Sequence, residues 1–149
     1  MVVTTAAQTI VVRGGNRLVG RVSIDGAKNA ALPAMAAALL TEEECILENV
    51  PVLEDVLVMI ELLRWLGAEV EFDQENHRVR ICAADIREFE APAHLVARMR
   101  ASFLVTGPLL ARFGRARSSP PGGCQLGTRP VDVDLRGFRK MGATIEERD

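Results

Sequence analysis

The order of secondary structure is clearest in residues 51–71, which read PVLEDVLVMIELLRWLGAEVE. From Asp55 to Leu66 the apolar residues recur every three or four positions, a spacing that predicts a helix with one buried face. Asp55 is a suitable N-cap, and Gly67 stands where many helices end. The residues after Gly67 are typical of a strand, so the stretch predicts a helix, a turn and a strand in succession.

The same order returns in residues 130–147. Pro130 precedes a predicted helix, Asp132–Met141, and Gly142 then precedes a predicted strand, Ala143–Glu147. The two Gly-Ala pairs, which begin at Gly67 and Gly142, are 75 residues apart. Both copies follow the order helix, strand, Pro, helix, Gly-Ala, strand, which indicates an internal repeat of β/α units. The alternative is that two ordinary αβ segments resemble each other by chance.

Other patterns complete the predicted fold. We expect two hairpins, Thr9–Arg13 with Arg17–Ile24 and Val70–Asp73 with His77–Cys82. We expect a buried helix over Ala30–Leu40, with Pro33 in its first turn, and a longer helix over Ala91–Phe113 that breaks at Gly107-Pro108. We also expect two short strands, Cys45–Val50 and Ala116–Ser119.

These elements divide the chain into three parts. We expect a tail and hairpin over residues 1–24, a first repeated unit over 25–82, and a second unit over 83–149 that is incomplete at its C-terminal end. A final strand without a neighbour exposes unpaired backbone groups. We therefore expect the chain to be part of a longer α/β protein.

Composition excludes several classes of protein. The 149 residues are 48% hydrophobic and 26% charged, with a net charge of −2, as in ordinary globular domains. We expect no membrane span, since the longest apolar run, Ala30 to Leu40, is far shorter than a span requires. We expect no signal peptide, since the N-terminus has no basic region followed by an apolar stretch. Three scattered cysteines, Cys45, Cys82 and Cys124, favour a reducing, cytoplasmic compartment over a disulfide framework. We expect no metal site, because neither the cysteines nor the two His have metal-ligand spacing.

Positive charge is concentrated in one part of the chain. Residues 91–131 contain no acid and six Arg: Arg98, Arg100, Arg112, Arg115, Arg117 and Arg129. A basic block in an otherwise acidic chain favours an anionic ligand over general binding of nucleic acid. A solvated helix face followed by a basic loop would show the same pattern.

Two segments carry candidate chemistry. The loop PGGCQLGTRP places Cys124 among glycines, with Arg129 five residues later, so nearby cations favour a reactive thiolate. An ordinary turn with an inert cysteine is the alternative. Lys28 and Asn29 lie at a predicted helix start, where free N–H groups bind anions. Lys28 alone would more often be a surface residue. Of Arg98 and the nearby Arg100, at most one is expected to face a site, since positions two apart on a helix diverge.

Several strings together resemble a known family. GAKNAALP, NVPVLEDV, LGAEV, MRAS, GPLLARFG, PGGCQLGTRPVD and MGAT occur in this order over residues 10–149. They resemble the N-terminal part of the enolpyruvyl transferases that act on UDP-N-acetylglucosamine. The resemblance implies an inside-out α/β barrel of repeated β/α units, truncated here. The N-terminal strand would pack with the other domain.

The resemblance also implies a reaction. The enolpyruvyl group of phosphoenolpyruvate passes to the 3′-hydroxyl of UDP-N-acetylglucosamine, and phosphate is released without a metal or other cofactor. The reaction is the first committed step of peptidoglycan synthesis, and the family is the target of fosfomycin. The implied partners are these two substrates and the missing C-terminal part of the enzyme. Because later units would supply further catalytic groups, we expect this chain alone to be inactive.

The resemblance assigns roles to individual residues. Cys124 matches the loop cysteine that acts in proton delivery or covalent attachment. Arg129, Lys28 and Arg100 match residues that contact the substrates, the first two phosphoenolpyruvate, and Asn29 matches the asparagine that binds the sugar nucleotide. The segment lining the uridine pocket corresponds to Pro130, Val131, Asp132 and Val133.

Two positions depart from the family pattern. Asp134 stands where His is expected, which adds negative charge near an anionic ligand, and Pro120 replaces an aliphatic residue at one end of the Cys124 loop. Two other functions remain open. One is the related transfer to shikimate 3-phosphate, whose family lacks the cysteine loop. The other is a non-catalytic chain that self-associates through an open strand edge.

Overall fold

The computed structural model describes residues 10–121 and 130–147. Its elements, in chain order, are α1 (Lys28–Ala37), the 3-10 helix η1 (Ala38–Leu40), β1 (Cys45–Leu47), α2 (Glu54–Leu66), β2 (Glu69–Asp73), β3 (Arg78–Cys82), β4 (Glu90–Ala91), α3 (Ala93–Val96), the 3-10 helix η2 (Arg100–Val105), α4 (Thr106–Phe113), β5 (Arg117–Ser118) and α5 (Asp132–Lys140). Among these described helices, none has the length and apolar character needed to cross a membrane.

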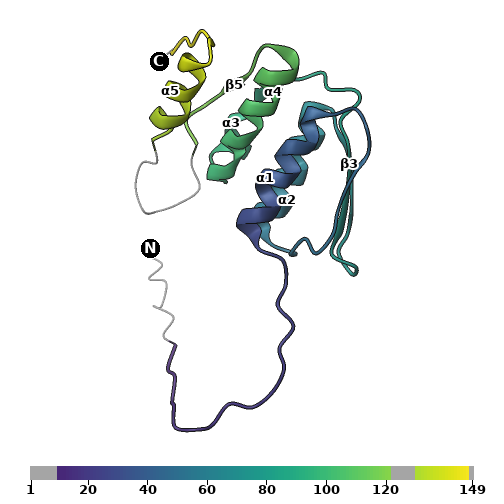
Figure 1. Ribbon diagram of the computed structural model, residues 1–149, viewed down its shortest axis with the longest axis vertical. Coiled ribbons are helices and arrows are strands. Elements are labelled where there is room, and N and C mark those ends of the chain that lie inside the picture. The colour runs from purple at the N-terminus through teal and green to yellow at the C-terminus, as the bar shows by residue number, and fades with distance from the viewer. Residues whose placement is uncertain (1–9, 122–129, 148–149) are drawn as a thin grey trace, which may run out of the picture.

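The first unit is a small sheet covered by two helices. Three antiparallel strands lie in the order β1-β3-β2, and α1 and α2 pack against one face (Figure 1). Ile81 of β3 lies between Cys45 and Val70 in register, and it is fully buried. Alternate residues of β3 are buried and exposed, so one face of the sheet contributes to the core.

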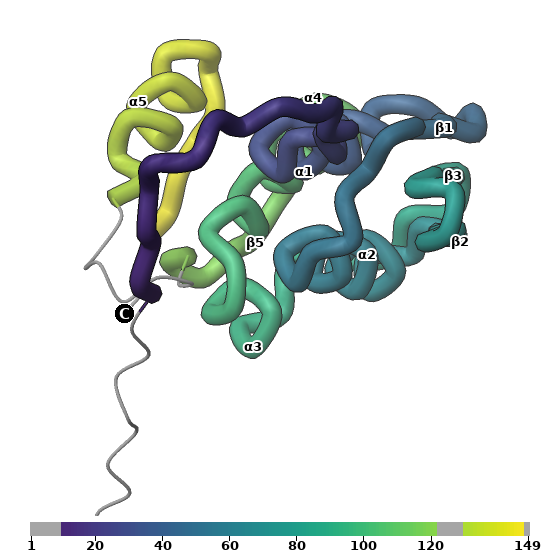
Figure 2. The backbone as a smooth tube through the Cα atoms, turned by 90° about the horizontal axis from the view of Figure 1, so that it is seen from below, coloured from purple at the N-terminus to yellow at the C-terminus, as the bar shows by residue number. Residues whose placement is uncertain are grey.

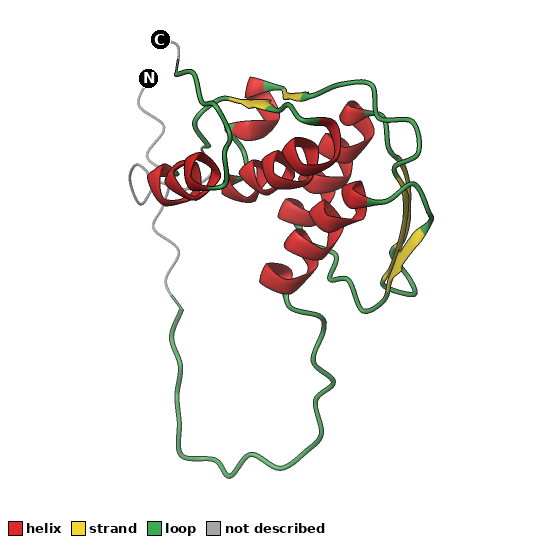
Figure 3. Ribbon diagram, turned by 45° about the horizontal axis from the view of Figure 1, so that its top comes forward, coloured by secondary structure: helices red, strands yellow, loops and turns green. Residues whose placement is uncertain are grey.

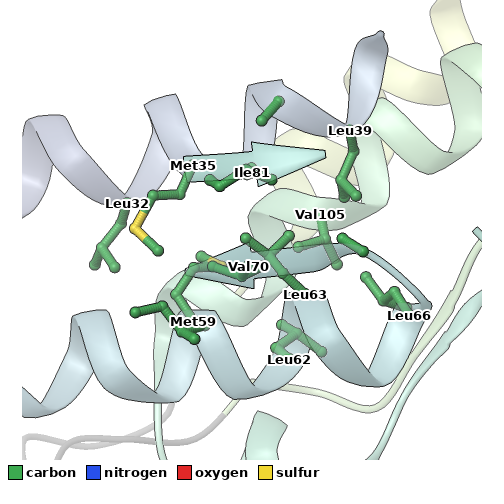
Figure 4. Close-up of a cluster of buried hydrophobic side chains, with 14 of the residues drawn as sticks. Leu32, Met35, Leu39, Met59, Leu62, Leu63, Leu66, Val70, Ile81 and Val105 are labelled. Carbon is green, nitrogen blue, oxygen red and sulfur yellow. The ribbon is translucent and has the colours of Figure 1, made fainter. Parts of the chain in front are cut away.

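One aliphatic core connects both units. Met35 of α1, and Met59 and Leu63 of α2, are fully buried and lie against the sheet (Figure 4). The same cluster continues into the second unit through Leu95 and Leu109. Burial of apolar surface stabilises a contact by roughly 25 cal/mol per Å², so this shared cluster helps to hold the two units together.

The second unit has less sheet and fewer buried residues. It contains the helical segment from α3 to α4, a short parallel pair of β4 with β5, and α5. Figure 2 shows the other helices between the sheet on one side and α5 on the other. Every residue of α5 is at least partly exposed.

Arg112 of α4 connects the second unit to the first through hydrogen bonds and an ion pair. Its guanidinium group donates hydrogen bonds to the carbonyl oxygens of Leu39, Thr41 and Ala83 at 2.8–3.0 Å. It also forms an ion pair with Glu42 at 3.1 Å. All three hydrogen bonds come from Nη1, which carries two hydrogens, so one of these hydrogens is shared between two carbonyl oxygens. This member of the basic block is therefore used to join parts of the fold.

Most predicted elements are confirmed with small shifts. The helix at 30–40, the helix at 55–66, the hairpin at 70–82 and the helix at 132–141 all appear. Gly67 ends α2 in a left-handed conformation, with φ 109°. The two predicted short strands are present as β1 and β5, each shorter than expected.

The helix boundaries need three corrections. Leu53, not Asp55, occupies the N-cap position of α2, and Asp55 lies in the first turn. Pro33 lies in the second turn of α1. The long helix breaks near Ala97–Met99, before η2, and not at Gly107-Pro108. Pro108 is tolerated there because it lies in the first turn of α4, where backbone N–H groups have no acceptor within the helix.

Two predicted strand regions are wrong. Residues 10–24 of the expected first hairpin contain no strand and form an extended loop away from the helices (Figure 3). Their apolar side chains stay exposed, for example Leu18 at 94% and Ile24 at 88%. Residues 143–147 also form no strand. A strand needs a hydrogen-bonded neighbour, and within the described residues neither segment has one.

The ends of α2 and α5 have matching geometry. The N–H groups of Gly67 and Ala68 bond to the carbonyls of Arg64 and Leu63. Those of Gly142 and Ala143 bond to the carbonyls of Arg139 and Phe138, all four positions being shifted by 75 residues. Both glycines have positive φ, 109° and 98°. We propose on this basis that the two helices belong to repeated units of the chain.

Candidate functional site

Four segments begin at one cavity. It has a volume of about 550 Å³ and lies where α1, α2, η2 and α5 start. Its lining consists of Lys28, Asn29, Leu32, Pro33, Asp55, Met99, Arg100, Ala101, Phe103, Leu104, Val131 and Asp134. The cavity therefore brings together residues that are more than 100 positions apart in the sequence.

Helix starts favour anions at this place. The first backbone N–H groups of a helix have no acceptor within it, and the N-terminal end carries partial positive charge. Lys28 and Asn29 are the first two residues of α1, and Val131 is the N-cap residue of α5. With a side-chain cation nearby, such a cavity is suited to phosphate and carboxylate groups.

The charged groups of the cavity come in two signs. The Lys28 Nζ atom lies 2.6 Å from Oδ2 of Asp55, and both side chains are partly exposed. Arg100 is exposed and has no partner among the residues that the structure describes. Asp134, in the first turn of α5, adds a second carboxylate. Arg100 is thus the cation most available to a bound anion.

Most other arginines of the basic block are engaged elsewhere. Arg98 bonds to Glu54 at 2.5 Å and to Glu61 at 3.0 Å, and the hydrogen bond to Glu54 is the main cause of its raised pKa. Arg117 pairs with Glu90, and Arg115 stacks on the ring of Phe89. Arg98 and Arg100 therefore diverge, and Arg100 is the one that lines the cavity.

The cavity collects four of the predicted site residues. Lys28, Asn29, Arg100 and Val131 line it. The neighbouring residues are exposed and outside the lining: Pro130, Asp132 and Val133. Asp132 lies 3.7 Å from Arg136 of the same helix. Cys124 and Arg129 lie outside the described residues. Across the described ranges, no group of three His, Cys, Asp or Glu is arranged to hold a metal ion.

Sequence reasoning missed two kinds of lining residue. The position of Asp55 predicts only a helix cap, although the string NVPVLEDV that contains it belongs to the family resemblance. The apolar wall of the cavity includes Phe103 and Leu104. The sequence does not mark these residues as cavity-lining, because they belong to an apolar periodic stretch. Such a stretch does not distinguish core from cavity wall.

The fold and the cavity define the class of protein: an α/β protein with a cavity at the starts of four helical segments. The sequence pattern of the family described as EPSP synthase (3-phosphoshikimate 1-carboxyvinyltransferase) matches residues 12–149. The chain therefore belongs to this family of enolpyruvyl transferases.

Individual relatives show which enolpyruvyl transferases the chain resembles in sequence. The chain is 52% identical over 139 residues to a UDP-N-acetylglucosamine 1-carboxyvinyltransferase from Koribacter versatilis, and 53% identical over 137 residues to one from Thermotoga petrophila. Each match covers 92% of this chain but 32% of the relative. The chain thus spans about a third of the length of these relatives.

A solved structure shares the fold. The enolpyruvyl transferase NikO from Streptomyces tendae superposes with a TM-score of 0.77 at 29% sequence identity. The superposition covers 91% of this chain and 29% of NikO. This likeness confirms the expected α/β fold of the enolpyruvyl transferases.

Proposed function

We propose that the protein to which this chain contributes transfers the enolpyruvyl group of phosphoenolpyruvate to the 3′-hydroxyl of UDP-N-acetylglucosamine. Phosphate is released, and the product enters cytoplasmic peptidoglycan synthesis, on which cell shape and division depend. The observation that carries the proposal is the gathering of Lys28, Asn29 and Arg100 around one cavity. Relatives about 50% identical bear the name of this activity.

The charges of the cavity suit the proposed substrate. Phosphoenolpyruvate carries a phosphate and a carboxylate, and Arg binds either group through paired hydrogen bonds. Lys28 and Arg100 bind this substrate, with Arg129 on its phosphate. Asn29 and residues 130–133 bind the sugar nucleotide. Cations placed in advance around a transferring group lower the barrier mainly by electrostatic stabilisation.

The proposed reaction is an addition followed by an elimination. The 3′-hydroxyl oxygen bonds to C2 of phosphoenolpyruvate and gives its proton to a base of the C-terminal units, while C3 gains a proton from the Cys124 thiol. The resulting tetrahedral intermediate then loses phosphate from C2 and returns a proton from C3 to the Cys124 thiolate, which restores the double bond. The C-terminal units of the complete protein would supply the remaining groups, so the isolated chain is proposed to be inactive.

Phosphate release tests this proposal directly. The 149-residue chain is compared with a fusion in which the C-terminal two thirds of the Thermotoga petrophila relative follow residue 149. With phosphoenolpyruvate and UDP-N-acetylglucosamine, we expect turnover from the fusion and none from the chain. Turnover by the chain alone would contradict the proposed need for the other units. A folded fusion without turnover would contradict the activity itself.

Fosfomycin provides a second test, which concerns Cys124. We expect peptide mass spectrometry to find the adduct at Cys124 and not at Cys45 or Cys82, which are half-buried in strands. Labelling of all three cysteines would indicate general thiol reactivity. Cys124→Ser is the matched variant, in which the adduct should disappear.

The matching family pattern carries the name of a related reaction, transfer to shikimate 3-phosphate. This second candidate is tested by offering the fusion shikimate 3-phosphate in place of the sugar nucleotide. A non-catalytic, self-associating chain is the third candidate, and the exposed apolar side chains of residues 10–24 favour it. Size-exclusion chromatography tests it, because a monomer of 16.2 kDa would argue against self-association.

A further inference from the structure

Asp55 is an acid inside a cavity suited to anions. It lies in the first turn of α2 and contacts Lys28, the first residue of α1, with 2.6 Å between Oδ2 and Nζ. Both residues line the cavity. The ion pair therefore connects the starts of two helices at the place where a ligand would bind, and α2 itself favours a carboxylate in its first turn.

We infer that Asp55 is a positioning residue, whose carboxylate holds the Lys28 ammonium group toward the cavity before phosphoenolpyruvate arrives. The inference rests on the proposed function of the cavity. A lysine ammonium has three donors, so one bond to Asp55 leaves two for a ligand. Without Asp55, the four-carbon stem of this partly exposed lysine would move among many rotamers.

Two opposite effects decide the sign of the expected change. Ordering a free lysine side chain on binding costs up to about thirtyfold in affinity. Removing a carboxylate several ångströms from a bound anion gains only about threefold in water, and salt reduces this gain. Positioning is therefore the larger effect, and loss of Asp55 weakens anion binding.

The chain has two lysines, Lys28 and Lys140, which permits an internally controlled experiment. Both are exposed, and Lys140 is the last residue of α5, at the end away from the cavity. Acetic anhydride labels both amines, and mass spectrometry gives the Lys28 label relative to Lys140. The phosphoenolpyruvate concentration that halves this ratio measures affinity at the cavity.

We expect Asp55→Asn to raise the half-protecting concentration about fivefold, and Asp55→Glu to restore it to within about twofold of wild type. Glu54→Gln is the matched control, because it removes the neighbouring first-turn carboxylate, which binds Arg98 and does not line the cavity. It should leave the concentration unchanged. Circular dichroism confirms that each variant is folded.

The outcomes separate this inference from the proposed function. If phosphoenolpyruvate protects Lys28 equally well or better in Asp55→Asn, Asp55 competes with the ligand and the positioning role is wrong. If it gives no protection in the wild-type chain, the described cavity does not bind this substrate, and the assignment of Lys28 fails together with the inference.

Discussion

At the residue scale, Asp134 has the clearest expected effect on binding. It lines the cavity and adds a negative charge where the family pattern has His. Asp134→Asn should tighten binding of phosphoenolpyruvate about twofold, since a charge within roughly 10 Å in water contributes about 0.4 kcal/mol. Titration calorimetry measures the change.

Glu69→Gln is the control for Asp134→Asn. Glu69 lies just beyond the far end of α2, so its charge is screened from the cavity. Weaker binding in Asp134→Asn would instead indicate that the carboxylate accepts a hydrogen bond from the substrate.

Arg112 is an arginine that stabilises the fold, whereas Arg98 is a surface arginine. Arg112 is only 14% exposed and satisfies three carbonyls, whereas Arg98 is 45% exposed. Arg112→Met should lower the free energy of unfolding by about 2–3 kcal/mol, because partly buried acceptors lose charged donors. Arg98→Met should cost less than about 1 kcal/mol. Urea unfolding compares them, and equal losses would contradict this distinction.

The residues that line the cavity could be predicted from the sequence to different extents. Lys28 and Asn29 could be predicted because their position at a helix start has chemical meaning by itself. The separation of Arg98 from Arg100 was predicted for one continuous helix, whereas in the structure the helix breaks between them, so the two side chains diverge for a different reason. The role of Asp55 could not be predicted, since its contact with Lys28 depends on how two helices pack. Local sequence does not contain that information.

At the scale of elements, the glycines at the ends of α2 and α5 provide a comparison. Gly67→Ala should destabilise the protein by about 2–4 kcal/mol, because φ is positive and the new Cβ would lie 2.5 Å from the Asp85 carbonyl oxygen. Gly142 has the same sign of φ but open space around it. Gly142→Ala should therefore cost only about 1–2 kcal/mol.

Urea midpoints measure the difference between the two glycine variants. Similar losses would mean that backbone strain alone decides both positions, and that the contact with Asp85 can relax.

Elements with a strong local period were predictable, and those that depend on partners were not. The periodic pattern of residues 55–66 predicted the bounds of α2 to within a residue or two, and Gly67 predicted where the helix ends. The β-rich composition of 10–24 suggested strands, but strands also need neighbours, and none lies beside this segment among the described residues. The break near Ala97–Met99 contains no Pro or Gly, so the sequence pattern did not predict it.

At the scale of the whole molecule, the shared core predicts cooperative unfolding. Buried residues of both units form one cluster, and Trp65 of α2 reports on their boundary. Its indole N–H donates to the Glu90 carbonyl at 3.2 Å, and its ring meets His94 edge-on. Fluorescence of this single Trp and far-UV circular dichroism should give the same urea midpoint. Separate midpoints would contradict a shared core and indicate two independent units.

The extended course of residues 10–24 makes the chain susceptible to limited proteolysis. Arg13, Arg17 and Arg21 recur every four residues along an exposed backbone outside regular structure. Proteases bind their substrates as extended strands, so trypsin should cut here first and leave a resistant product that begins near Val22. Arginines of the helical core, such as Arg112, should be cut only after unfolding. Removal of this segment would therefore yield a shorter domain for crystallisation.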